Sequence, residues 1–208
     1  MFTNTLSPNT LRGLKLIGNE KWLNFAYLAG GTALALRLGH RQSVDLDFFT
    51  PDKFDEQIIL AGLQKTGQYK ARQTAWRTVK GHLFGVSFSL FYYSYPILAK
   101  DDNFLGIKIA SLKDIAAMKI NAIEDRGSKR DFIDLYFLSQ NFSFEEMLKF
   151  YNQKYQCLKD HRYNILKSLN YFEDAESEDS PQMIKPVDWE KVKTLFQEES
   201  KKLSSSFI

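Results

Sequence analysis

The chain has 208 residues, enough for one large domain or for a core with a helical appendage, because domains commonly contain about 100 to 200 residues. Hydrophobic residues make up 44% and charged residues 25%, and the 17 Phe and 10 Tyr offer large side chains to a core, which excludes a disordered chain. The net charge of +3 permits binding to a polyanion such as RNA without requiring it.

Cysteine usage and the apolar runs bear on where the protein works. Because Cys157 is the only cysteine, neither an internal disulfide nor a cysteine-based zinc cluster is expected. The first residues lack the basic and then apolar pattern of a signal peptide, and no apolar run reaches the roughly 20 residues that cross a bilayer. The sequence therefore predicts a soluble, cytoplasmic protein with no membrane partner.

The N-terminal part of the chain combines helical spacing with a glycine pair. Apolar residues at near-helical spacing over 10–28 predict a helix that ends at the turn Gly30-Gly31. The segment 32–38 is rich in helix formers and predicts a short helix whose first amides lie at the glycines. Such amides, with the Thr32 hydroxyl and the partial positive charge of a helix start, suit a phosphate. An ordinary tight turn is the alternative.

The next segment, 43–50 (SVDLDFFT), alternates in the manner of a strand and is ended by Pro51. Asp45 and Asp47 share one face, about 6.6 Å apart, and the residues of the other face are Val44, Leu46 and Phe48. Because aspartate is disfavoured in strands, this pair predicts a site for Mg²⁺ or Mn²⁺. The alternative is a solvent-facing strand side on which the aspartates pair with Lys or Arg.

The rest of the chain separates into a β-rich and a helical region. A further helix is predicted over 54–63. Two β-rich runs follow over 69–79 and 83–93, with a hairpin turn between them at Gly81-His82, and an edge strand is predicted over 107–109. Helices are then predicted over 112–125, 130–140, 144–155, 161–171 and 189–203, with an exposed acidic loop at 173–181. We therefore expect an α/β (α+β) core over 1–110, a small mixed sheet flanked by helices, and a mainly helical region over 111–208 that completes a cleft.

Charged residues of the helical region follow a second pattern. Lys119 and Arg126 lie seven residues apart and share one helix face, from which both side chains can reach triphosphate oxygens. Asp131 and Asp134 lie on one side of the next helix, and Lys129 stands at its start. The alternative is an ion-pair network that braces the two helices.

Two blocks of sequence occur in a specific order. The first joins LAGGTALAL (28–36) to RQSVDLDFF (41–49), and the second joins AAMKINAI (116–123) to RGSKRDFIDLY (126–136). Together they resemble the AbiEii/AbiGii toxin family of nucleotidyltransferases, within the polymerase-beta-like superfamily. The resemblance implies metal-dependent transfer of a nucleoside monophosphate from a nucleoside triphosphate (NTP) onto an acceptor hydroxyl, with RNA, in particular the 3′ end of tRNA, as acceptor. It also implies the toxin of a toxin-antitoxin or abortive-infection pair, with a cognate antitoxin protein as partner.

The resemblance assigns roles to residues of both blocks. Catalysis is assigned to Asp45, Asp47, Lys119, Asp131 and Asp134, the first two as metal ligands, and nucleotide binding to Gly30, Gly31, Thr32, Ser43, Arg126 and Lys129. The run 85–91 lacks the third strand carboxylate that superfamily enzymes usually carry. Two alternatives follow: a nucleotide- or RNA-binding module with a degenerate site, and a transferase whose acceptor is a protein side chain. A sugar transferase is disfavoured by the glycine turn and the second block.

Overall fold

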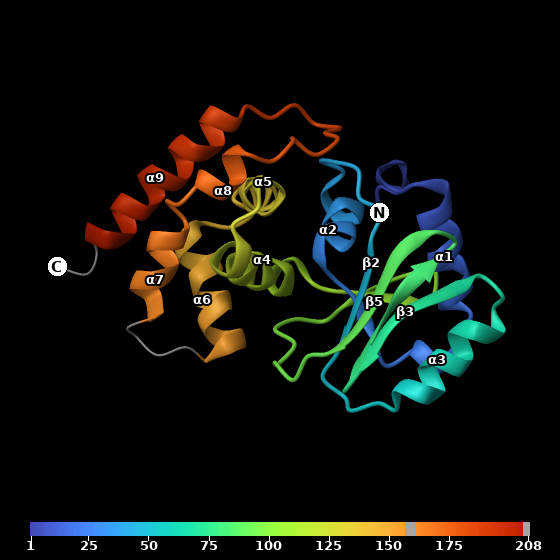
Figure 1. The fold of residues 1–208 in the computed structure, drawn as a ribbon. Helices are drawn as coiled ribbons and strands as arrows, with labels where there is room; N and C mark the ends of the chain where they lie inside the picture. Colours follow the sequence, from blue (N-terminus) through green and yellow to red (C-terminus); the bar gives the residue numbers. More distant parts are fainter. Residues whose placement is uncertain (157–160, 206–208) are drawn as a thin grey trace. The chain divides into compact units, whose positions relative to one another are not determined.

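The computed structural model describes residues 1–156 and 161–205, so that Cys157 lies outside the described residues. The chain divides into two compact units, Met1–Ser111 and Leu112–Ile208. Figure 1 shows that the first contains the β-sheet and that the second is helical. Across the described ranges, none of the helices combines the length and the apolar character needed to cross a membrane.

Unit 1 is built on a seven-stranded sheet with the order β3-β4-β5-β2-β1-β7-β6. Its strands are β1 (Tyr27–Leu28), β2 (Leu46–Thr50), β3 (Tyr69–Ala75), β4 (Thr78–Leu83), β5 (Val86–Tyr92), β6 (Asp102–Phe104) and β7 (Ile107–Ile109). The pairs β2–β5 and β1–β7 are parallel, and the other neighbours are antiparallel. This mixed sheet with helices around it confirms the predicted α/β (α+β) fold class.

One face of the sheet is apolar and buried, with the side chains of Leu46, Phe48, Val79, Leu83, Phe88 and Leu90. The helices of this unit are α1 (Pro8–Gly18), α2 (Gly30–Leu38) and α3 (Glu56–Lys65), with short 3-10 turns at Thr3–Thr5 and Lys21–Leu23. α1 begins where the Ser7 side chain accepts a hydrogen bond from the Thr10 amide, and α3 begins where Asp55 accepts from two amides. Local capping thus fixes where these helices start.

The prediction of one helix over 10–28 is wrong beyond Gly18, where α1 ends. A side chain at Gly18 would collide with the backbone oxygen of Leu105, so the chain passes very close to a neighbouring segment there. Further on, Tyr27 and Leu28 form β1, a short and fully buried strand between β2 and β7. Apolar residues of a short buried strand cannot be distinguished from a helix face by spacing alone.

The predicted hairpin turn at 81–82 is also wrong, because both residues lie inside β4. The turns of this three-strand meander are at 76–77 and 84–85 instead. Gly81 is explained by packing, since a side chain there would clash with the ring of Tyr69 on β3. The predicted edge strand is β7, which is not at the edge, because β6 pairs with its outer side.

Unit 2 contains the predicted helices: α4 (Leu112–Arg126), α5 (Lys129–Leu138), α6 (Phe144–Tyr155), α7 (His161–Ser168) and α9 (Trp189–Ser205). The prediction that 173–181 is entirely loop is wrong, because it begins with the short helix α8 (Glu173–Glu176). This turn forms because Ala175 is fully buried and Glu176 pairs with Lys193 of α9.

Two kinds of contact hold unit 2 together. Aromatic rings of four residues pack edge-to-face or tilted, at centroid distances of 5.0 to 6.5 Å: Phe132, Phe172, Trp189 and Phe196. In addition, the fully buried ammonium of Lys154 on α6 lies 2.8 Å from an oxygen of Asp114 on α4. The pair supports the packing of α6 on α4.

Candidate active site

The carboxylate of Asp47 lies on the face of the sheet opposite to the apolar core. Its neighbours Leu46 and Phe48 are 0% and 1% exposed, whereas Asp47 is partly exposed, as expected for alternate residues of a strand. β2 begins at Leu46, so Asp45 lies immediately before the strand, although the predicted strand began at residue 43. The segment before β2 bonds instead to the N-terminal region, because Thr10 donates to the backbone oxygen of Val44.

The glycine turn passes directly beside the Asp47 carboxylate. The amide of Ala29 donates to the backbone oxygen of Asp47 at 3.0 Å. Gly30 follows with φ +66°, and a Cβ at this position would lie 3.4 Å from Oδ2 of Asp47. A side chain at Gly31 would clash with the guanidinium of Arg41. Glycine at position 30 therefore keeps the start of α2 open next to a carboxylate oxygen, and glycine at position 31 lets the Arg41 guanidinium lie close to the backbone.

Thr32 and Ser43 hold the segment before β2 against α2. Oγ1 of Thr32 lies 2.5 Å from the backbone oxygen of Asp45 and 2.9 Å from Oγ of Ser43. Because Thr32 is 1% exposed, its hydroxyl is engaged inside the protein and fixes the backbone of Asp45. The structure thus brings together all the residues of unit 1 that the sequence singled out: Gly30, Gly31, Thr32, Ser43, Asp45 and Asp47.

Ser89 is a residue of this site that the sequence did not reveal. It faces Asp47 across the parallel β2–β5 pair, and its Oγ donates to Oδ1 of Asp47 at 2.5 Å. A carboxylate at this position of β5 would lie close enough to Asp47 to bind a cation together with it. This chain has the hydroxyl of Ser89 there instead. The register between two strands so distant in sequence is not visible in the sequence, and only the alternation of Ser87 and Ser89 with apolar residues hinted at a polar face.

The donor set at Asp47 fits a hard divalent cation that also binds phosphate. One oxygen of Asp47 accepts from Ser89, while the other faces the open space at Gly30. Asp45 lies two residues earlier, with its backbone oxygen bound by the Thr32 hydroxyl. Within residues 1–156 and 161–205, no three His, Cys, Asp or Glu side chains form a site that could hold a metal by themselves. Mg²⁺ characteristically uses one or two carboxylates and takes its other ligands from water and substrate phosphates.

The charged residues of the second block form a separate cluster in unit 2. Nζ of Lys119 lies 2.8 Å from Oδ1 of Asp131 and 2.5 Å from Oδ2 of Asp134. Nε of Arg126 lies 2.8 Å from Oδ2 of Asp131, which also accepts from the Ser128 hydroxyl at 2.6 Å. Burial alone would raise the pKa of Asp131, but the charges and hydrogen bonds of Lys119 and Arg126 outweigh it and lower this pKa to about 2.

Exposure separates the members of this cluster. The side chains of Asp131 and Asp134 are 0% exposed and that of Lys119 is 6% exposed, so their contacts join α4 to α5 inside the unit. The side chain of Arg126 is 56% exposed, and an anion in solution can approach it. Lys129 is placed elsewhere: it is buried, its ammonium donates to the backbone oxygen of Glu178, and it lies 5.5 Å from the Trp189 ring.

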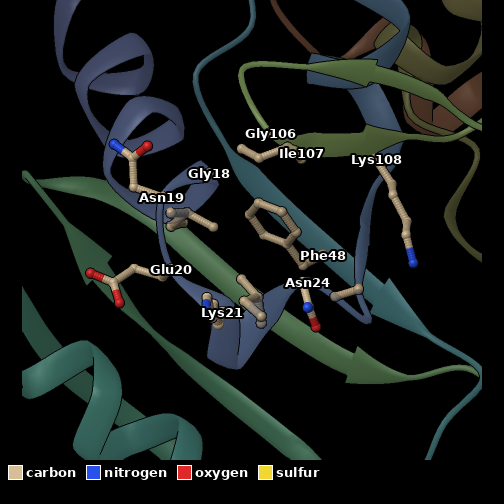
Figure 2. A pocket seen from close by; sticks show the side chains of 12 residues that line it. Gly18, Asn19, Glu20, Lys21, Asn24, Phe48, Gly106, Ile107 and Lys108 are labelled. Atoms are coloured by element: carbon tan, nitrogen blue, oxygen red, sulfur yellow. The ribbon is translucent and has the colours of Figure 1, made fainter.

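A cavity of about 330 Å³ lies on the other side of the sheet from the Asp47 carboxylate. Phe48 lines it, and successive strand residues point to opposite faces. Figure 2 shows the Phe48 ring pointing into this cavity between Gly18 and Ile107, with the Lys108 side chain extending away from the ring. No residue that the sequence singled out for chemistry lines it.

The fold of this protein is shared with solved structures that include a nucleotidyltransferase. The structure of JHP933 from Helicobacter pylori has a TM-score of 0.57 and 24% identity, covering 97% of this chain and 96% of that chain. MenT4, the nucleotidyltransferase toxin Rv2826c from Mycobacterium tuberculosis H37Rv, has a TM-score of 0.60 and 17% identity, covering 93% and 81%. At these identities, both similarities establish the fold.

Residues 14–90 and 92–204 match the family model described as nucleotidyl transferase AbiEii toxin, type IV TA system. The chain therefore belongs to the AbiEii nucleotidyltransferase toxin family. It is also 44% identical over 185 residues to the uncharacterized protein aq_aa25 of Aquifex aeolicus (strain VF5), covering 86% of this chain and 87% of that protein. The predicted family and class of enzyme are confirmed.

Proposed function

We propose that this nucleotidyltransferase moves a nucleoside monophosphate from an NTP onto an acceptor hydroxyl at Asp45 and Asp47, with Mg²⁺ or Mn²⁺. The observation that carries the proposal is the approach of the Gly30 turn to Oδ2 of Asp47. A helix start is a phosphate-binding feature and a carboxylate is a metal-binding feature, and a metal-bound triphosphate needs both side by side.

Each residue around Asp47 then has a physical task. The oxygen of the acceptor hydroxyl bonds to the α-phosphorus and its proton passes to solvent, while the bond from the α-phosphorus to the bridging oxygen breaks and pyrophosphate leaves. Glycine at position 30 leaves room for phosphate oxygens near the first amides of α2, and Ser89 orients the Asp47 carboxylate. Thr32 and Ser43 fix the backbone that carries Asp45. A bound Mg²⁺ would supply charge stabilisation for the phosphates and the leaving pyrophosphate.

For unit 2 we propose that Lys119, Asp131 and Asp134 brace α4 against α5 and thereby orient Arg126. The two carboxylates and two cations balance in charge, and the three bracing side chains are buried. Arg126 alone of the four is more than half exposed, which suits the contact with phosphate that the sequence predicted for it. Lys129 is bonded to Glu178, which supports a structural role for this lysine.

We further propose RNA, in particular the 3′ end of tRNA, as acceptor, and an antitoxin protein as the cellular partner. The family's description as the toxin of a type IV system supports the toxin role. NTPs and tRNA are abundant in the cytoplasm, so this proposal keeps the predicted location. The second candidate is a binding module that does not turn over its nucleotide, which is favoured by Ser89 in place of a third carboxylate beside Asp47.

The test is to incubate the protein with Mg²⁺ or Mn²⁺, each of the four α-labelled NTPs and total RNA, and to separate RNA from polypeptide. Label in RNA, absent with Asp45→Asn, is the expected result and names the nucleotide. Label in polypeptide would instead make a protein the acceptor. Triphosphate binding without label in either fraction would favour the binding module.

A further inference from the structure

The face of the sheet that carries Asp47 continues as a polar surface over three neighbouring strands. The register places Asp47 of β2 next to Ser89 of β5, Ser89 next to Lys80 of β4, and Lys80 next to Gln73 of β3. Residues paired in register point to the same face, so these side chains form one row across the sheet. A depression of about 310 Å³ runs along this row and reaches the Asp47 side chain.

This depression is rich in positive charge. Lys80, Arg72 and His82 line it, and Lys70 is next to His82 in the register. In the part of the chain that the structure describes, none of these basic side chains has a carboxylate within ion-pair distance. Unpaired cations on one sheet face attract a polyanion.

Aromatic side chains lie along the same face, one row away. Phe91 of β5 lines the depression, its ring lies 5.0 Å from Nζ of Lys80, and its centroid is 5.5 Å from that of Phe49 on β2. Both rings are partly exposed. Cations along a groove with aromatic rings beside them are typical of surfaces that bind single-stranded nucleic acid, where the rings stack on bases.

The two sides of Asp47 differ in the groups that could bind the two anionic substrates, the triphosphate and the acceptor RNA. The glycine turn that leads into α2 follows β1, on one side of β2, whereas the basic depression lies over β5, β4 and β3, on the other side. On the first side, a triphosphate has the start of α2 and the open space at Gly30. The basic side therefore remains for the second substrate, whose hydroxyl must meet the α-phosphate at Asp47.

We propose that this basic surface, formed by Arg72, Lys80, His82 and Phe91, binds the single-stranded 3′ end of the acceptor RNA and leads its terminal hydroxyl to Asp47. The proposal rests on the transfer activity proposed above. Lys80 and Arg72 contact backbone phosphates, and Phe91 stacks on a base. Because phosphate contacts and stacking on a base do not distinguish one base from another, binding is expected to depend little on the RNA sequence.

The test measures binding of a fluorescein-labelled single-stranded oligouridylate to the full chain by anisotropy, as a function of salt, alongside NTP binding. Each lost phosphate contact weakens single-strand binding about fivefold at 0.1 M salt, so Arg72→Gln with Lys80→Gln weakens it about 25-fold and lowers the salt slope by about 1.4. Phe91→Leu weakens it about fivefold or more at unchanged salt slope. NTP binding is retained in all of these variants.

Lys65→Gln is the matched control, since Lys65 is an exposed residue near the end of α3 and does not line the depression. It removes one charge and leaves oligouridylate binding as in the wild type. Equal weakening by Lys65→Gln, or wild-type affinity of the double variant, overturns the proposal. Loss of NTP binding in the double variant also overturns it, because the surface would then hold the triphosphate. Failure of the proposed transfer activity gives a different result from failure of the surface proposal. In that case the wild type would bind oligouridylate at this surface but would transfer no label to RNA.

Discussion

At the scale of single residues, the site depends on what surrounds one carboxylate. Asp47 receives a hydrogen bond from Ser89 on one oxygen and faces a glycine on the other. The first contact orients the carboxylate, and the second keeps space for a ligand. In the proposed function, both affect how a metal-bound phosphate is held beside Asp47.

Gly30→Ala tests the space beside Oδ2. Alanine at φ +66° costs about 1 kcal/mol in backbone strain, and its methyl group would lie 3.4 Å from this oxygen. We expect transfer to fall about tenfold or more, corresponding to about 1.4 kcal/mol, at a modest loss of thermal stability. Gly67→Ala is the control, because Gly67 has φ +67° and no atom within 4 Å of its Cβ position. If both variants lose the same activity, strain alone explains the effect.

Ser89→Ala tests the orientation of the carboxylate. A hydrogen bond to a charged group contributes about 1.5 to 3 kcal/mol, so its loss is expected to lower the transfer rate about tenfold and to weaken Mn²⁺ binding. Steady-state rates over a Mn²⁺ titration measure both. Ser94→Ala changes an exposed serine beyond β5 and serves as control. Wild-type Mn²⁺ dependence in Ser89→Ala would show that Asp47 is held by other contacts.

At the scale of elements, the junction of α4 and α5 depends on the buried charges around Asp131. Lys119 contacts both aspartates of α5, and Ser128 and Arg126 complete the contacts of Asp131. Removing one member of such a buried group is costly because the charges that remain are no longer balanced. The stability of these two helices should therefore depend on the ionisation of Asp131.

Asp131→Asn should destabilise α4 and α5 by about 3 kcal/mol at neutral pH. The pKa of Asp131 is lowered to about 2 in the folded protein, so its contribution is present above the unfolded pKa of about 4 and is lost as the pH falls toward 2. Between pH 4 and pH 2, protonation of Asp131 should lower the free energy of unfolding of the wild type by about 2 kcal/mol, and Asp131→Asn should not show this decrease. Hydrogen exchange of α4 and α5 against urea at pH 7, 4 and 2 measures it.

Asp125→Asn is the control for this experiment, because Asp125 is exposed on the same helix and accepts a hydrogen bond from Asn121. It should leave the exchange of α4 and α5 nearly unchanged. An acid profile of Asp131→Asn that matches the wild type would contradict the assignment of the pH dependence to Asp131.

The sequence predicted elements best where local signals were strong. The long helices of unit 2 have regular apolar spacing, and β2 has clear alternation. β1 was missed because two buried residues, Tyr27 and Leu28, carry no period. The turn at 81–82 was misplaced because Gly81 serves packing against Tyr69, which only the paired strands reveal. Ser89 and the basic surface likewise depend on strand register, a property of partners far apart in the chain.

At the scale of the whole molecule, the chain forms two compact units, one with the β-sheet and one that is helical. Unit 1 presents the Asp47 carboxylate, a glycine turn and an unpaired basic surface, and unit 2 contains the buried ion pairs Lys119–Asp134 and Lys154–Asp114. The family and the class of enzyme could be predicted from the two sequence blocks, which span both units. The acceptor could not, because its contacts would be spread over β3, β4 and β5.

The most direct test of the account compares pyrophosphate release by the wild type, Asp47→Asn and Asp52→Asn, with Mg²⁺ or Mn²⁺, the four NTPs and total RNA. Asp52 is an exposed residue just beyond β2 and controls for the loss of one negative charge. We predict that Asp47→Asn lowers the rate about 100-fold or more while remaining folded, and that Asp52→Asn matches the wild type. Wild-type rates in Asp47→Asn would contradict the placement of the reaction at this carboxylate.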